Sequence, residues 1–253
     1  MYHELETAGR PLCQDDAGYV RYVITDSEFR RQIGSLRDAG FIGLSVSEAL
    51  GRDRTDKGLA ITFDDGSETD LTVAAPLLKD LGFKATFYVV AAFLGRRGYL
   101  SEAQVIELAG MGFEIGCHSM SHRFLPGLSD DDLNVEIAEA KVRLEEIIGK
   151  PVDHFSCPGG RWSMRAARVA REAGYKSMAT SRTGVNSAAT DRFSLARIAV
   201  KRETTLEELG QWRRGEGLIA RKARESLFAA AKGVLGTSTY EKVRSRILDK
   251  SGN

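Results

Sequence analysis

The sequence is poor in the residues that cross-link small secreted domains. Its 253 residues include three cysteines, Cys13, Cys117 and Cys157, and no two of them form a CxxC pair. An odd and sparse set of this kind argues against a disulfide scaffold and favours small core residues in a reducing compartment. A chain of this length can bury a core large enough to fold without such cross-links.

Long apolar runs and excess charge are also missing. No segment approaches the length of a membrane span, and the first residues, MYHELETAGRPLC, lack the basic start and apolar stretch of a secretory signal. We therefore expect a cytoplasmic chain. The formal net charge is only +1, from 36 basic and 35 acidic residues, so overall charge gives no support to nucleic-acid binding. The remaining composition, 42% hydrophobic and 28% charged, is typical of a globular protein.

One pattern recurs along the chain and indicates alternating helices and strands. A helical segment ends in glycine, an aromatic residue follows, and a short apolar run begins. Glycine just past a helix end suits a left-handed cap, and the aromatic then opens a buried strand. The pattern occurs at Gly40-Phe41, Gly82-Phe83, Gly112-Phe113 and Gly174-Tyr175. The helices predicted before these glycines are 26–39, 67–81, 101–111 and 163–173.

The apolar runs predict parallel strands. The candidates are 59–63, 84–90, 113–117, 153–157, 176–180 and 197–200, with 1–3 and 41–44 as further possibilities. Strands that alternate with helices imply parallel βα units, and seven or eight of them favour a barrel over an open sheet. The expected fold class is therefore α/β, with a barrel rather than an open sheet.

The last fifty residues differ from the rest and predict a helical C-terminal extension. From residue 201 to 253 there are 12 lysines and arginines against 7 acidic residues. We divide the chain into a barrel, 1–205, and a basic helical extension, 206–253. The extension is expected to pack on the barrel with a solvated basic face. The alternative is a surface for an anionic membrane or a partner, which would make the protein membrane-associated.

Two clusters of polar residues follow predicted strands. Asp64-Asp65 ends the run LAITF, and His118 and His122 follow the strand EIGC. In parallel α/β folds functional side chains gather at such strand ends. A helical turn would place two histidines four residues apart on one side. Two imidazoles and one carboxylate can hold a divalent metal with positions left for water, and the other aspartate is then placed as a general base. This donor set fits zinc and other first-row metals.

The same residues resemble a known family. TFDDG (62–66) and HSMSH (118–122) look like the first two motifs of the NodB-type polysaccharide deacetylases, carbohydrate esterase family 4. The resemblance runs over about residues 1–205. It implies a distorted (β/α)7 barrel and a metal-dependent amide hydrolase acting on a carbohydrate. It implies that Asp64 is the base and that Asp65, His118 and His122 hold one divalent metal, zinc, with nickel, cobalt or iron as alternatives.

The third motif of that family departs from its usual form. FSCPGGRW (155–162) has Ser156 where the family commonly has an arginine that orients the base. Arg161 and Arg197 are both possible replacements. Gly159 stands in the slot of the motif's tyrosine, which removes a side chain from the groove wall but leaves a backbone N–H that could hold an oxyanion.

The last two motifs are not found in their usual places. The fourth, an aspartate and tryptophan pair, is not evident, and Trp162 could line the site or pack on the surface. The fifth, Leu-x-His, is missing, since no histidine follows His154, which we expect to be structural. The N-terminal MYH has the same spacing, so we expect a circularly permuted member in which His3 is the general acid. The alternative is a frayed terminal histidine.

These observations predict a deacetylase that acts on N-acetylated sugars of a polysaccharide or its precursor. One alternative is another amide hydrolysis on this scaffold, such as deformylation of a lipid-linked sugar or opening of a cyclic ureide. The other is a non-catalytic glycan-binding barrel, against which the complete set of Asp64, Asp65, His118 and His122 argues.

Overall fold

The computed structural model describes residues 1–51 and 57–218. It divides into a compact unit, Met1–Leu209, and a second unit that begins at Gly210. Of the predicted basic extension, residues 206–218 are described, and they include helix α9 (Leu206–Arg213). The rest of the predicted membrane or partner surface lies outside the described residues. The boundary at 205 and 206 thus stays a prediction. Within the described ranges, no helix has the length and apolar character needed to cross a membrane.

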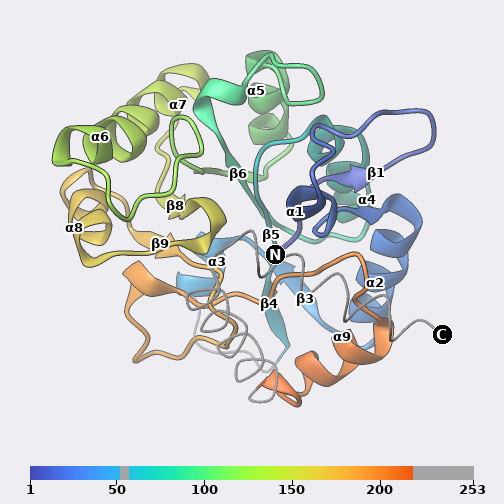
Figure 1. Ribbon diagram of the computed structural model, residues 1–253. Helices are drawn as coiled ribbons and strands as arrows, with labels where there is room; N and C mark the ends of the chain where they lie inside the picture. The colour runs from blue at the N-terminus through green and yellow to red at the C-terminus, as the bar shows by residue number, and fades with distance from the viewer. Residues whose placement is uncertain (52–56, 219–253) are drawn as a thin grey trace. The chain divides into compact units, whose positions relative to one another are not determined.

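The centre of the compact unit is a parallel sheet of five strands, in the order β5-β6-β7-β8-β9. All neighbouring pairs are parallel. Burial of nearly every strand residue agrees with a sheet that is covered on both faces (Figure 1). The strands are β5 (Thr62–Phe63), β6 (Thr86–Val89), β7 (Glu114–Cys117), β8 (His154–Ser156) and β9 (Ser177–Ala179).

Hydrogen bonds at both edges curl this sheet into a closed ring. Tyr2 forms a parallel bridge with Phe63 of β5, and Leu195 forms one with Ala179 of β9. The chain that follows Leu195 then reaches the N-terminus, where the Met1 amino group donates to the Ile198 carbonyl and the Val200 N–H donates to the Met1 carbonyl. The expectation of an α/β fold with a distorted barrel is confirmed.

Shorter strand pairs and helices surround the ring. Two further parallel pairs are β1 (Leu5–Glu6) with β2 (Ile24–Thr25) and β3 (Ile42–Leu44) with β4 (Gly58–Ala60). The helices of the unit's first half are α1 (Ala17–Val20), α2 (Asp26–Asp38), α3 (Val46–Gly51), α4 (Ala75–Asp80) and α5 (Glu102–Gly110). The second half has α6 (Asp130–Asn134), α7 (Ala140–Ile148) and α8 (Met164–Glu172).

Local sequence explains where the long helices begin and end. Thr25 caps α2, Ser163 caps α8, and Ser101 with Gln104 forms a complete capping box on α5. All four glycines of the repeated Gly-aromatic pattern have positive φ, between +67° and +88°. That conformation is the one predicted for a helix C-terminus, and the aromatic after each glycine leads into the next strand or its approach.

The structure corrects several predicted elements. The run 59–63 is interrupted at Ile61 and forms two short strands, β4 and β5. The segment 197–200 is not a regular strand, although it makes the hydrogen bonds that close the ring. The predicted helix 67–81 is a π-helix, η1 (Asp70–Ala74), followed by α4. The helices between 130 and 148, joined by the π-helix η3 (Val135–Glu139), were not predicted, because no Gly-aromatic pair marks their end.

Candidate active site

The two adjacent aspartates follow β5 at the carboxyl end of the sheet. The Asp64 N–H donates to the Tyr2 carbonyl and so continues the strand pairing, whereas Asp65 has a left-handed backbone with a φ of +81°. This turn sends the two carboxylates to different partners. Both side chains are buried, so each needs a compensating charge.

Asp65, His118 and His122 converge on one point. One oxygen or ring nitrogen from each lies within 4.8 Å of the others, and no other such group of three was found among the described residues. The Nε2 atoms of both histidines lie 3.4 Å from the Asp65 Oδ1 atom. The His118 Nδ1 atom is 2.9 Å from the Ser156 carbonyl, which leaves Nε2 to face the cluster.

This geometry fits a metal cation. The Asp65 Oδ1 atom is buried and has no hydrogen-bond partner, so the protein itself leaves a carboxylate oxygen unsatisfied there. Two imidazoles and one carboxylate are donors that zinc and related metals accept. The three donors therefore can hold a divalent ion, as the sequence predicted.

Backbone strain is concentrated at the same place. Asp65, Ser119 and His122 are the non-glycine residues with positive φ in the described chain, at +81°, +73° and +65°. Such conformations persist only where surrounding contacts hold them, and they cluster at functional sites. The two histidines are thus set by a strained loop. The expectation that a helical turn brings them together was wrong.

Asp64 is held by a buried arginine. Arg197 donates from Nη1 to the Asp64 Oδ1 atom at 2.7 Å and from Nη2 to Oδ2 at 2.8 Å. The Ser156 hydroxyl donates to Asp64 Oδ2 and accepts from Arg197 Nη2. The sequence left Arg161 and Arg197 as alternatives for the arginine that orients Asp64, and in the structure Arg197 makes this contact. Ser156, at the position of the usual arginine, joins the same network.

The electrostatics of these groups keep Asp64 ionised. Burial disfavours the carboxylate, but the charges of Arg197 and His118 outweigh it, so the pKa of Asp64 lies well below its ordinary value. Burial likewise opposes ionisation of Asp65, whereas His118 and His3 hold the pKa of that carboxyl down. Both aspartates can thus accept a proton or a cation at neutral pH.

The charged groups of the site lie close enough to His3 to change its pKa. Burial lowers its pKa, Arg197 and His118 lower it further, and Asp65 and Asp64 oppose the change. The centre of its ring lies 4.9 Å from that of the Tyr22 ring, with the two planes tilted by 36°, and its Nδ1 atom is buried without a hydrogen-bond partner. His3 is therefore packed within the fold, and the alternative of a frayed terminal histidine is wrong.

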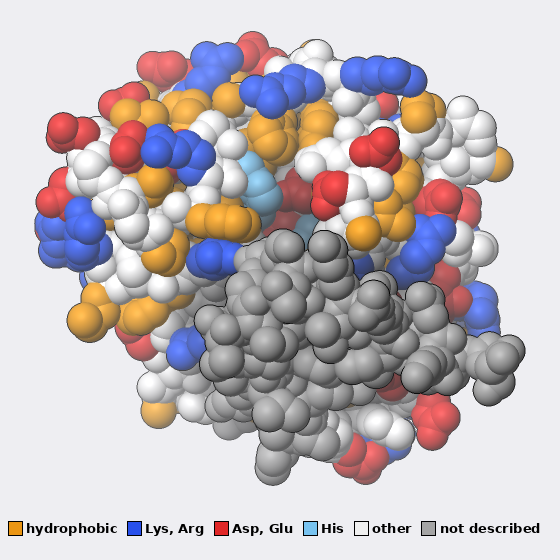
Figure 2. All heavy atoms as spheres, in the orientation of Figure 1, with side chains coloured by type: hydrophobic (Ala, Val, Ile, Leu, Met, Phe, Trp, Pro, Cys, Tyr) orange, Lys and Arg blue, Asp and Glu red, His pale blue; other side chains and the backbone are white. Residues whose placement is uncertain are grey.

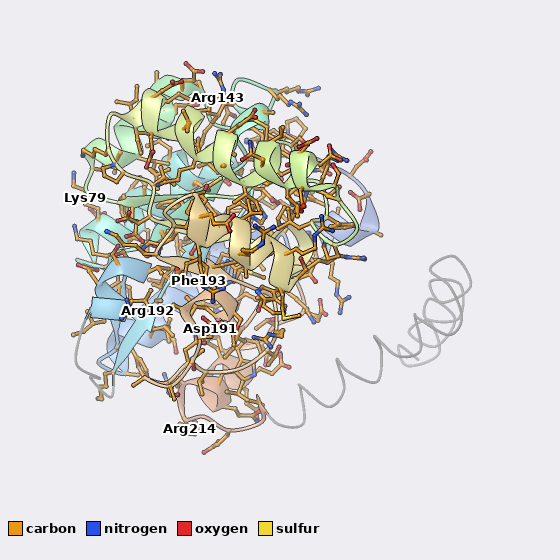
Figure 3. The ribbon with its side chains drawn as sticks, turned by 90° about the vertical axis from the view of Figure 1, so that its left-hand side faces the viewer. Lys79, Arg143, Asp191, Arg192, Phe193 and Arg214 are labelled. Carbon is orange, nitrogen blue, oxygen red and sulfur yellow. The ribbon has the colours of Figure 1, made fainter. Side chains whose placement is uncertain are left out.

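The other groups predicted for the site are Gly159, Arg161 and Trp162, and each has different surroundings. The Gly159 N–H has no acceptor among the hydrogen bonds of the described residues, and Gly159 itself has a φ of +58°. Arg161 does not reach Asp64, and its guanidinium lies 4.1 Å from the centre of the Phe124 ring. Trp162 donates its indole N–H to the Phe193 carbonyl in the 3-10 turn η5 (Arg192–Ser194), beside α8 (Figure 3).

Some residues of the site were missed by sequence reasoning. Glu136 is buried in η3 and accepts from both the backbone N–H and the hydroxyl of Ser121, between the two histidines. Asp70 is fully buried with neither oxygen hydrogen-bonded, and burial together with Asp65 and Glu4 raises its pKa well above the ordinary value. Neither residue belongs to a motif or follows a predicted strand, so the sequence offered no signal for it.

The remaining histidine is structural, as expected. His154 begins β8, and its two ring nitrogens lie 2.8 Å from the hydroxyls of Ser47 and Ser177.

At the other end of the strands, the face seen in Figure 2 has a hollow in which histidine and acidic side chains are visible. Hydrophobic and basic side chains border that hollow.

A parallel α/β barrel with a two-histidine, one-carboxylate cluster beside an ionised aspartate defines a class of proteins equipped for metal-assisted hydrolysis. Comparison with known proteins identifies the family. The profile of the family named polysaccharide deacetylase matches residues 51–178, which include the carboxylates and both histidines of the cluster, and the chain belongs to this family. A circular permutation remains a prediction.

Individual relatives agree with this assignment. The chain is 30% identical to the Bacillus subtilis protein YxkH over 182 residues, 70% of this chain and 65% of that one. It is 33% identical over 124 residues to a peptidoglycan-N-acetylglucosamine deacetylase of Bacillus cereus, covering 49% of this chain and 56% of the relative. The chain thus spans less than two thirds of these relatives. The solved Streptococcus pyogenes deacetylase PplD, in complex with acetate, aligns with a TM-score of 0.73 and 25% identity over 83% of this chain and 94% of PplD.

Proposed function

We propose that this protein is a metal-dependent hydrolase that removes N-acetyl groups from the sugars of a polysaccharide or its precursor. The observation that carries the proposal is that two adjacent carboxylates have different partners. Asp64 pairs with Arg197, and Asp65 faces the two histidines. Family membership and the similarity to the B. cereus and S. pyogenes deacetylases support the substrate class.

Asp65, His118 and His122 would hold the metal, and we propose zinc, with nickel, cobalt or iron as alternatives. The bound cation would supply Lewis acidity for activation of a water molecule and for polarisation of the acetamide carbonyl. The protein's own groups carry the proton transfers. Asp64, ionised by Arg197, takes a proton from the attacking water.

Two further groups complete the proposed reaction. The Gly159 N–H, which has no acceptor within the described chain, donates a hydrogen bond to the developing oxyanion. His3 gives a proton to the departing nitrogen, because an amine anion is a very poor leaving group. The C–N bond of the amide breaks, and acetate and an amino sugar are released.

Deformylation of a lipid-linked sugar remains the second candidate. The observation in its favour is the altered third motif, in which Gly159 stands in place of the family's tyrosine and Ser156 in place of its arginine. The alternative for the extension, a basic surface for an anionic membrane or a partner, would suit a lipid-linked substrate, and the described part of the extension ends at residue 218.

The test is to load the protein with zinc and assay it on N-acetylglucosamine oligomers and on N-formylated sugars, with acetate and formate measured separately. We expect acetate release, with one metal ion per chain by elemental analysis. The matched control is His118→Ala, which should lose both the metal and the activity. Formate release alone would establish the second candidate, and full metal occupancy in His118→Ala would contradict the proposed ligand set.

A further inference from the structure

The loop that follows the second histidine places an aromatic ring at the surface. Phe124 is two residues after His122, and 48% of it is exposed, whereas the next residue, Leu125, is buried. An exposed phenylalanine forgoes the gain from burying a large apolar surface. The loop could have placed its apolar side chain inward, as it does with Leu125.

Contacts on two sides fix the orientation of this ring. The Arg161 guanidinium carbon lies 4.1 Å from the ring centre, so it covers one face. A Cβ atom added to Gly159 would lie 2.6 Å from Cε1 of Phe124, so an edge of the ring occupies the space above Gly159. With both contacts in place, Phe124 is still 48% exposed.

These contacts put the ring between the two loops that form the site. Phe124 belongs to the loop with the metal-ligand histidines. Gly159 belongs to the loop that begins at Ser156, which bonds Asp64 and accepts from His118. Gly159 stands where the family's third motif has an aromatic side chain, and here a ring reaches the same place from a different loop.

The guanidinium of Arg161 can add hydrogen bonds beside the Phe124 ring. This guanidinium lies over the ring. A guanidinium stacked on a ring keeps its N–H groups at the edge of the stack, where they can donate to oxygen acceptors. A partly exposed aromatic ring bordered by hydrogen-bond donors matches a sugar, which has a C–H face and hydroxyl groups around it.

We propose that Phe124 and Arg161 form a subsite for the sugar next to the one that is deacetylated. The inference rests on the proposed function and adds to it the residues that bind the neighbouring sugar unit. Phe124 stacks on the neighbouring sugar ring, and Arg161 donates to its oxygens. Both residues act on binding and take no part in the proton transfers.

The test compares N-acetylglucosamine with its tetramer on the zinc-loaded protein. For Phe124→Ala we expect about a tenfold rise in KM for the tetramer, kcat within about twofold, and no change for the single sugar. Phe124→Tyr keeps the ring and should behave as the unchanged protein, whereas Arg161→Gln should show a smaller rise for the tetramer only. Ile106→Ala on α5, with a side chain of similar exposure (50%), is the matched control.

Binding of the tetramer, measured by calorimetry, tests the subsite separately from turnover. If no acetate is released from any sugar but Phe124→Ala still weakens tetramer binding, the proposed function fails and the subsite stands. Equal losses for the single sugar and the tetramer, or a faster reaction in Phe124→Ala, would overturn the subsite. Metal content and thermal unfolding of each variant identify a folding defect, and Phe124→Leu then replaces the alanine variant.

Discussion

Two neighbouring carboxylates at the end of β5 would repel each other if they shared one environment. Their side chains instead enter different networks, because the left-handed conformation of Asp65 turns the chain between them. Asp64 receives a guanidinium in a two-point contact, and Asp65 faces two imidazoles. One aspartate is thus suited to take protons and the other to bind a cation.

Replacement of Asp64 by asparagine should leave the metal bound and lower kcat by about two to four orders of magnitude, since an amide cannot take the proton of the attacking water. It also leaves Arg197 buried without its counter-charge, at a cost of roughly 3 kcal/mol, so rates should be compared well below the unfolding temperature. The control is Asp65→Asn, which should lose the metal. An Asp64→Asn protein with unchanged kcat would place the base elsewhere.

Replacement of His3 by glutamine should retain the metal and lower the rate on amides. The loss should be smaller on an acetate ester, whose leaving group needs less help from an acid. Because the pKa of His3 is lowered, mainly by burial, its acid form is lost as pH rises through a value below the usual 6.5. The kcat/KM profile should therefore fall with rising pH in that range, and His3→Gln should lack this fall. Identical pH profiles for both proteins would exclude His3 as the acid.

At the scale of elements, the histidine loop is held from outside by a helix that contributes no metal ligand. Glu136, in the π-helix η3, accepts from the Ser121 N–H at 2.9 Å and from the Ser121 hydroxyl, and its carbonyl accepts from the Met120 N–H. A π-turn shifts the helical register, and such turns occur often at functional sites. These bonds counter the strain of the left-handed His122.

Replacement of Glu136 by glutamine should weaken metal binding by about tenfold, because the amide cannot accept from both Ser121 groups at once. The measurement is a competition titration with a chelating dye, which reports metal affinity without turnover. Glu139→Gln is the matched control, since Glu139 belongs to the same π-helix but is exposed. Equal metal affinities in the two variants would show that Glu136 does not hold the loop.

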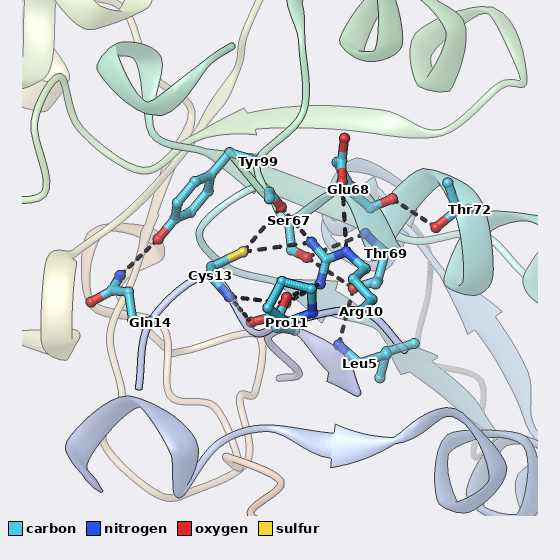
Figure 4. Close-up of polar contacts among 12 residues, drawn as sticks. Leu5, Arg10, Pro11, Cys13, Gln14, Ser67, Glu68, Thr69, Thr72 and Tyr99 are labelled. Carbon is cyan, nitrogen blue, oxygen red and sulfur yellow. Dashed lines mark hydrogen bonds and ion pairs between the residues drawn. The ribbon is translucent and has the colours of Figure 1, made fainter. Parts of the chain in front are cut away.

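At the scale of the whole compact unit, the barrel is closed by its first residues. Met1 and Tyr2 lie between β5 and the segment 198–200, and Tyr2 packs on Phe29 and Phe63. The following residues are tied down as well, as Figure 4 shows. Leu5 donates to Thr69, and Arg10 donates to the Gly98 carbonyl. His3 therefore lies in an anchored segment rather than on a loose end.

Replacement of Tyr2 by alanine should lower the free energy of unfolding by about 3–5 kcal/mol, as expected when a buried aromatic side chain is deleted. Tyr2→Phe removes only the hydrogen bond to Gln32 and should cost about 1 kcal/mol. Urea unfolding of the three proteins measures both differences. A Tyr2→Ala protein as stable as Tyr2→Phe would mean that the N-terminal strand adds little to the closed barrel.

The sequence by itself determined the parts of this protein that depend on neighbours along the chain. Glycine followed by an aromatic fixed the helix ends, because only local backbone conformation is involved. The two short motifs, TFDDG and HSMSH, identified the family and the residues that form the cluster, since strand ends in a parallel sheet meet at one edge.

Only the tertiary structure decided which distant groups complete the site. Arg197, rather than Arg161, pairs with Asp64 across 133 positions in the chain, and Glu136 reaches the histidine loop from a helix without a motif. Phe124 fills the space over Gly159 from another loop. Sequence spacing does not encode such contacts, because they arise from how the ring closes and how loops from different strands meet above it.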